Sequence, residues 1–139
     1  MNKLILVSEH DAGGTGAFVA CNQFLVSILN PLPRLCPEQT VSMQKHNETE
    51  ECFVLLRGRA MLYVADGEQA PGRIEAHLLE PGKIFTVPRG VWHSPVMSPD
   101  AKILLVEDRN TGNDNSPRVP LTEDQKAVVV ALGKQHWAV

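Results

Sequence analysis

Two short segments of this sequence, residues 46–58 and 82–93, carry side chains that can hold a metal ion. The first contains His46 and Glu51, and the second ends at His93. Two imidazoles and one carboxylate commonly hold a divalent metal and leave coordination positions open for water and a substrate. Such a metal can polarise a carbonyl or hydroxyl group, lower the pKa of bound water or activate dioxygen, depending on the ion. The residue types therefore indicate metal-assisted chemistry without naming a substrate.

Strand-like segments bounded by Gly, Pro, Asn and Asp recur at short intervals and must position these side chains. They are predicted over residues 18–29, 40–46, 51–56, 60–65, 73–79, 84–88 and 102–107. Short strands at this spacing favour an antiparallel sandwich or barrel. A single helix is predicted near the C-terminus, where Thr122 and Gln125 make a capping box and the pattern continues to Gly133. Residues 109–120 are rich in turn residues and are predicted to form a surface loop.

Alternation along the strands predicts which side chains share a face with the histidines. Gln44 and His46 are two residues apart in one predicted strand and point the same way, so Gln44 can join the site. Glu51 shares a face with Phe53 and Leu55, which places a carboxylate at the end of an apolar row. A buried carboxylate is costly unless it finds a cation or a donor, and a metal would supply that partner.

Aromatic side chains near the site are candidates for a substrate pocket. Pro88 ends a predicted strand and leads into a loop that presents Trp92 and His93. Trp92 could stack on a ligand there or pack at the rim of the barrel, and Tyr63 could point to a substrate acid or be solvated. We expect Trp92, Phe53 and Tyr63 to line the pocket.

The two segments resemble the paired motifs of the cupin superfamily, written G-x5-H-x-H-x3-4-E-x6-G and G-x5-P-x-G-x2-H-x3-N. The matching residues are His46, Glu51 and Gly58 in the first motif and Gly82, Pro88, Gly90 and His93 in the second. The resemblance implies an all-β fold, an antiparallel double-sheet jelly-roll barrel, that residues 1–139 form as a single cupin domain beside the short C-terminal helix. It also implies a homodimer and a divalent metal at the barrel mouth, with iron, manganese, nickel and zinc as the candidates.

The sequence departs from the motifs at two positions. Gln44 stands where the first histidine of the pair is expected, and Met97 stands where the final asparagine is expected. His46, Glu51 and His93 are then the predicted metal ligands. Gln44 can add its amide oxygen, which favours an ion tolerant of oxygen ligands, such as manganese or iron. Without a metal, the same residues would form a polar network in the barrel.

Three functions are compatible with these observations. The first is an enzyme that acts on a small polar metabolite, such as a sugar derivative or a carboxylic acid, by metal-assisted isomerase, lyase or dioxygenase chemistry. The second is a metal-free barrel that binds or senses a small ligand. The third is a structural dimer module whose edge strands pair across the dimer. Resemblance at the level of the fold does not choose among them.

Composition narrows the choice of partners. A chain of 139 residues, 43% hydrophobic and 21% charged, is the size and composition of one soluble domain. The net charge of −3, without a block of like charges, gives no reason to expect nucleic acid or an anionic membrane, so the expected partner is a small molecule. The apolar run of residues 4–7 is too short for a signal peptide or a membrane span, and we expect a cytoplasmic protein.

Overall fold

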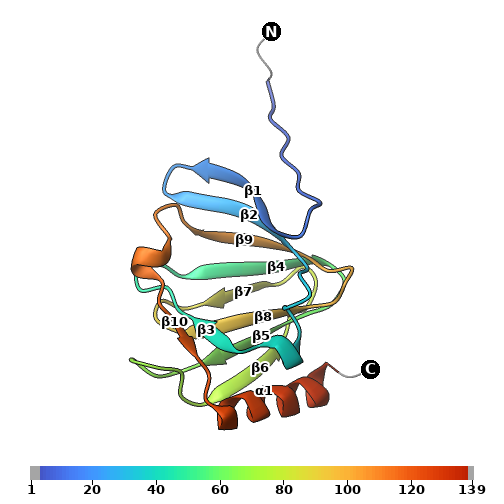
Figure 1. Ribbon diagram of the computed structural model, residues 1–139. Coiled ribbons are helices and arrows are strands. Elements are labelled where there is room, and N and C mark those ends of the chain that lie inside the picture. The colour runs from blue at the N-terminus through green and yellow to red at the C-terminus, as the bar shows by residue number, and fades with distance from the viewer. Residues whose placement is uncertain (1–3, 138–139) are drawn as a thin grey trace.

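The computed structural model describes residues 4–137, except for the side chain of Ala17, and shows two five-stranded antiparallel sheets (Figure 1). The strand order is β1-β2-β9-β4-β7 in the first sheet and β10-β3-β8-β5-β6 in the second. The elements in chain order are β1 (Gly14–Cys21), β2 (Phe24–Asn30), η1 (Pro37–Gln39), β3 (Ser42–Gln44), β4 (Glu51–Arg57), β5 (Ala60–Ala65), β6 (Ile74–Leu78), β7 (Ile84–Val87), β8 (Trp92–Met97), β9 (Lys102–Asp108), η2 (Asn113–Asn115), β10 (Arg118–Pro120) and α1 (Glu123–His136). The predicted all-β double-sheet fold with a C-terminal helix is confirmed.

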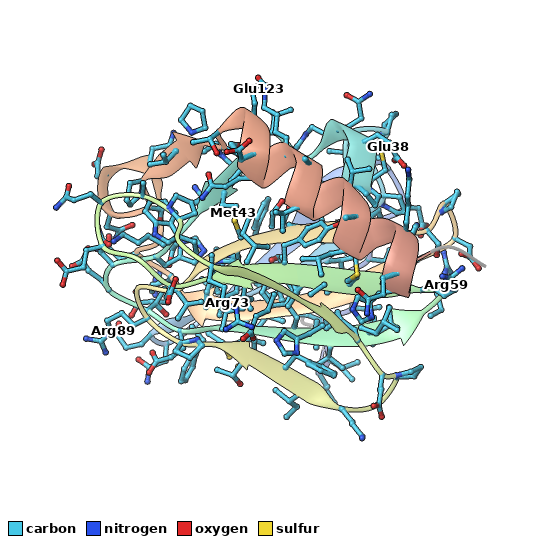
Figure 2. All side chains as sticks on the ribbon, turned by 90° about the horizontal axis from the view of Figure 1, so that it is seen from below. Glu38, Met43, Arg59, Arg73, Arg89 and Glu123 are labelled. Atoms are coloured by element: carbon cyan, nitrogen blue, oxygen red, sulfur yellow. The ribbon has the colours of Figure 1, made fainter. Side chains whose placement is uncertain are left out.

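Alternate side chains of the second sheet pack into two separate apolar clusters. On β5, Leu62 packs with Phe53 and Ile103 of the first sheet, and this inter-sheet cluster fills the space between the sheets. The next residue, Tyr63, joins the outer cluster with Met43 beneath helix α1. Figure 2 shows the helix lying across the sheet, with Met43 beside it in this view. The second sheet is therefore covered on both faces.

Two strand predictions need correction. The segment predicted as one strand over residues 18–29 belongs to a hairpin, β1 and β2, which turns at Asn22 with a φ of 59°. The loop predicted to present Trp92 and His93 is wrong at these residues, because both belong to strand β8, which contains Pro95 in its middle. Proline is tolerated there because β8 pairs with β3 at one residue only, so that side of the strand has few ladder hydrogen bonds to lose.

The segment after β9 is also more ordered than the surface loop predicted for residues 109–120. It contains the short helix η2 and strand β10, which pairs with β3 through Arg118 opposite Gln44. This pairing brings the end of the loop back to the strand that precedes His46. Within residues 4–137, no helix combines the length and the apolar run that crossing a bilayer would need.

Helix α1 does not end at Gly133 but continues to His136. The capping box of Thr122 and Gln125 is present as predicted. Gly133 is required by packing, because a Cβ at this position would lie 2.6 Å from Cβ of Pro37 and 3.0 Å from the Tyr63 hydroxyl. The glycine therefore lets α1 approach η1 closely, which is a different role from helix termination.

Candidate metal and substrate site

Three ligand-type side chains meet at one end of the space between the sheets. Glu51 begins β4, His93 lies on β8, and His46 follows the end of β3. Glu51 Oε1 lies 3.0 Å from His46 Nε2 and 3.1 Å from His93 Nε2. All three residues are buried, and one ligand atom from each lies within 4.8 Å of the others. The structure thus brings together the histidines and the glutamate singled out in the sequence, and the cluster could bind a divalent metal.

Hydrogen bonds behind each imidazole determine which ring nitrogen faces Glu51. His93 Nδ1 lies 3.1 Å from the Val91 carbonyl oxygen, which can only accept, so Nδ1 carries the proton. His46 Nδ1 lies 2.7 Å from Ser116 Oγ. The Ser116 hydroxyl donates its proton to Asn115 Oδ1 at 3.2 Å, so its oxygen accepts from His46. His46 therefore also carries its proton on Nδ1. In the neutral rings, both Nε2 atoms present lone pairs toward the carboxylate.

Lone pairs that face one another in this way need a cation between them, either a proton on an imidazole or a metal ion. Ligands bonded to one ion at about 2.0–2.2 Å lie about 3.0–3.5 Å apart, from octahedral to tetrahedral angles, and Glu51 Oε1 lies at the short end of this range from both rings. Burial alone would raise the pKa of Glu51, but when the two imidazoles carry the intervening protons, the hydrogen bonds and positive charges of His46 and His93 outweigh burial and lower this pKa to about 2. Glu51 is therefore ionised at neutral pH, as a carboxylate ligand must be.

Glu107 on β9 faces the same space and was not among the residues predicted from the sequence. Its Oε2 lies 3.6 Å from His46 Nε2. That oxygen is buried and has no hydrogen-bond partner within residues 4–137. Burial, followed by the negative charge of Glu51, raises the pKa of Glu107 to about 8. The site therefore contains a second carboxyl group close to Glu51, and its Oε2 atom has no partner among the described residues.

These side chains open onto a cavity of about 230 Å³, which Arg34 and Arg118 also line. Neither arginine forms an ion pair in the part of the chain that the structure describes. Burial, and then the charge of Arg34, lowers the pKa of Arg118. Two guanidinium groups without acidic partners favour an anionic ligand, because a planar guanidinium binds a carboxylate through two parallel hydrogen bonds.

Two more of the predicted site residues, Gln44 and Phe53, line this cavity. The Gln44 side chain already has partners for both ends of its amide. Its Oε1 accepts a hydrogen bond from Arg118 at 3.3 Å, and its Nε2 donates to the Ser116 carbonyl at 3.2 Å. Gln44 therefore connects the arginine to the residue that orients His46.

Trp92 and Tyr63 lie away from the cavity, in the outer cluster beneath α1. Trp92 Nε1 donates to the Gly67 carbonyl at 2.9 Å, and the Tyr63 hydroxyl donates to the Val129 carbonyl at 2.7 Å. Strand alternation is the reason, since Trp92 immediately precedes His93 and must face the opposite side of β8. Of the three residues expected to line the pocket, Phe53 lines the cavity, whereas Trp92 and Tyr63 do not.

The sequence matches the family model described as ureidoglycolate lyase over residues 6–129. It is 31% identical over 108 residues to ureidoglycolate lyase 1 of Rhizobium meliloti (strain 1021), a match that covers 75% of this chain and 61% of that protein. It is 29% identical over 101 residues to ureidoglycolate lyase of Burkholderia cepacia, covering 70% of this chain and 57% of that protein. The chain thus spans about three-fifths of the length of these curated relatives.

Solved structures support the fold. A Pac13 variant from Streptomyces, solved with uridine, has a TM-score of 0.60 at 12% identity and covers 91% of this chain and 98% of that one. A second Pac13 structure, described as a nucleoside dehydratase, has a TM-score of 0.57 at 12% identity, covering 85% and 89%. Similarity at this level of identity concerns architecture alone. The family match over most of the chain, together with the paired motifs on a double-sheet fold, shows that the chain belongs to the ureidoglycolate lyase family within the cupin superfamily.

Proposed function

We propose that the protein is a metal-dependent lyase that acts on a small carboxylic acid, with ureidoglycolate as the first candidate substrate. The observation that carries this proposal is a single cavity lined by His46, Glu51 and His93 and by two arginines that form no ion pair within residues 4–137. Family membership supports the lyase class, and the names of the curated relatives supply the candidate substrate.

The size and charge of the cavity suit such a substrate. Its volume of about 230 Å³ is below the range of about 300–1,000 Å³ that is usual for larger ligands. Arg34 and Arg118 would bind the substrate carboxylate, which orients the rest of the molecule toward the two histidines. Phe53 and Leu105 form part of the apolar wall and would limit access of water to the reacting carbon.

Cleavage of ureidoglycolate needs no further reactant. The bond between the hydroxyl-bearing carbon and the urea nitrogen breaks, and its electron pair stays on nitrogen. The hydroxyl group loses its proton as it becomes the carbonyl of glyoxylate, and a proton added to nitrogen completes urea. A divalent metal held by His46, Glu51 and His93 would supply Lewis-acid stabilisation of the negative charge that develops on oxygen.

The test is to strip the purified protein with a chelator, reload it separately with Mn²⁺, Fe²⁺, Ni²⁺ or Zn²⁺, and measure glyoxylate and urea. We expect equal amounts of both products with at least one ion and none in the stripped protein. Arg118→Gln should raise KM without changing metal content. Arg89→Gln is the matched control, because Arg89 is exposed and points outward at the molecular surface (Figure 2).

Two outcomes would contradict the proposal. Absence of both products from protein shown to contain metal would refute lyase activity on this substrate. Thermal stabilisation by ureidoglycolate that survives the chelator, without turnover, would favour a metal-free binding barrel instead, since a ligand stabilises whichever form binds it.

We also propose that the protein forms a homodimer through the edge of its first sheet. Phe18 on β1 and Phe24 on β2 are 61% and 56% exposed, and β1 is the edge strand (Figure 1). Contact between two such edges would cover apolar side chains and unpaired strand groups. Light scattering should give the dimer mass, and Phe18→Ser should shift it toward the monomer. A monomer at all accessible concentrations would contradict this proposal.

A further inference from the structure

We infer that Glu107 is the fourth protein ligand of the metal and compensates for Gln44, which stands at a histidine position of the first motif. The inference rests on the metal dependence proposed above. It extends that proposal by assigning a ligand that lies outside both motifs, on β9.

The position of the Glu107 carboxyl group is the first argument. Its Oε2 lies 3.6 Å from His46 Nε2, and the side chain is only 15% exposed. This oxygen has no hydrogen-bond partner among the described residues. A buried carboxyl oxygen that faces the lone pair of an imidazole is unfavourable without an intervening cation. A shared metal ion would satisfy both atoms.

The strand register is the second argument. β4 and β9 run side by side (Figure 1), with Cys52 opposite Val106. Glu51 and Glu107 are the next residues along these two strands, so the pairing brings two carboxyl groups together at the same end of the sheet. With both groups ionised, like charges opposite each other would destabilise the sheet. A divalent ion between them would convert this repulsion into attraction.

The third argument is that Gln44 is less available than Glu107. Its amide oxygen accepts from Arg118 and its amide nitrogen donates to the Ser116 carbonyl. Two carboxylates also balance the charge of a divalent ion, which leaves the arginines free for a substrate anion. A set of two imidazoles and two carboxylates is richer in oxygen than the usual motif and favours Mn²⁺ or Fe²⁺.

The decisive variant is Glu107→Gln, which keeps the shape of the side chain and removes its charge. Affinity for Mn²⁺ is measured from the electron paramagnetic resonance signal of the free ion. We expect a loss at least as large as the about 10–100-fold that follows removal of an outer-shell partner. Glu50→Gln is the matched control, because Glu50 adjoins Glu51 but is exposed, and it should bind Mn²⁺ as the parent does.

Two further measurements separate ligation from a structural role. In the presence of chelator, Glu107→Gln should be at least as stable to urea as the parent, because it removes one of two facing carboxyl groups. Adding Gln44→His to Glu107→Gln should restore a fourth ligand, recover affinity and shift the preference toward Ni²⁺ or Zn²⁺.

Parent-like Mn²⁺ affinity in Glu107→Gln, together with loss of binding in His93→Ala, would overturn the assignment of Glu107 and leave the proposed metal site standing. Absence of binding by the parent protein itself would instead refute the metal site, and the assignment of Glu107 with it.

Discussion

Trp92 and His93 are neighbours on β8, yet they belong to two regions of the molecule with opposite properties. Trp92 is 1% exposed in the outer cluster, and its indole N–H donates to the Gly67 carbonyl. His93 faces inward, toward Glu51, in a group of polar side chains that includes Glu107, whose Oε2 has no partner in the described part of the chain. The polar atoms of Trp92 and Tyr63 on the outer face are paired within the protein, whereas the inner end holds Glu107 Oε2 without a partner among the described residues.

We infer that the two faces of this sheet have separate roles, the outer face in stability and the inner face in metal binding. Substitutions in the outer cluster should reduce the free energy of unfolding and leave metal affinity unchanged. Substitutions at the inner end should reduce metal affinity and cost less stability, because uncompensated charges are removed together with the ligands. The following predictions test this division.

Trp92→Ala should have the largest effect on stability. Loss of the indole leaves a cavity beneath α1 and removes the donor to Gly67, so the free energy of unfolding should fall by about 3–5 kcal/mol. Urea unfolding measures this change. Metal affinity, measured well below the new unfolding midpoint, should equal that of the parent, and a parallel loss of affinity would show that the two faces are coupled.

In the metal-free protein, stability should fall as pH rises from about 4.5 to about 8. Glu107 keeps its proton in the folded state, while the unfolded chain releases it above its ordinary pKa. The stabilisation is therefore complete below the unfolded pKa and is lost as pH rises through the folded one. We expect a change of a few kcal/mol at most, since solvent screens part of the effect.

Urea unfolding in chelator across this pH range measures the slope, and Glu107→Gln should flatten it. Glu38→Gln is the control from the other region, because Glu38 is an exposed residue of η1 near the helix (Figure 2). An unchanged slope in Glu107→Gln would show that another group titrates.

His93→Ala should weaken metal binding at least about 100-fold, or about 2.8 kcal/mol. Its free energy of unfolding without metal should fall less than that of Trp92→Ala. Equilibrium dialysis with Mn²⁺ followed by elemental analysis gives the affinity. If His93→Ala retained stoichiometric metal, the ion would be bound elsewhere, and the assignment of metal binding to the inner face would be wrong.

Tyr63→Phe should have the smallest effect. It removes a hydrogen bond to the Val129 carbonyl within α1, and a single neutral hydrogen bond contributes about 0.5–1.5 kcal/mol. Thermal unfolding should show the small loss, and metal content should match the parent. A change in metal content would again indicate that the outer cluster influences the site.

Much of the site follows from two local patterns in the sequence. The paired motifs identify His46, Glu51 and His93, and the structure brings these side chains together. Alternation could also have revealed Glu107, which ends an inward row after Ile103 and Leu105 just as Glu51 begins one. The same rule places Trp92 and His93 on opposite faces of β8. The prediction that both line one pocket followed from their being neighbours in sequence and did not apply the two-residue period of a strand.

Other parts could not be predicted from local sequence. Arg34 and Ser116 lie in connections, and their place at the cavity depends on strand pairing far along the chain, including that of β10 with β3. The turn at Asn22 carries no glycine to mark it, so residues 18–29 read as one strand. The missed features are those that depend on which strands become neighbours.

The hydrogen bond from His46 to Ser116 has a kinetic consequence. It joins residues 70 positions apart, and contacts this distant form late because the intervening loop must close first. We therefore expect the ligand set to be oriented late in folding, so that a metal ion would not act as a folding nucleus. Bound metal should slow unfolding in proportion to its affinity and leave the rate of folding unchanged.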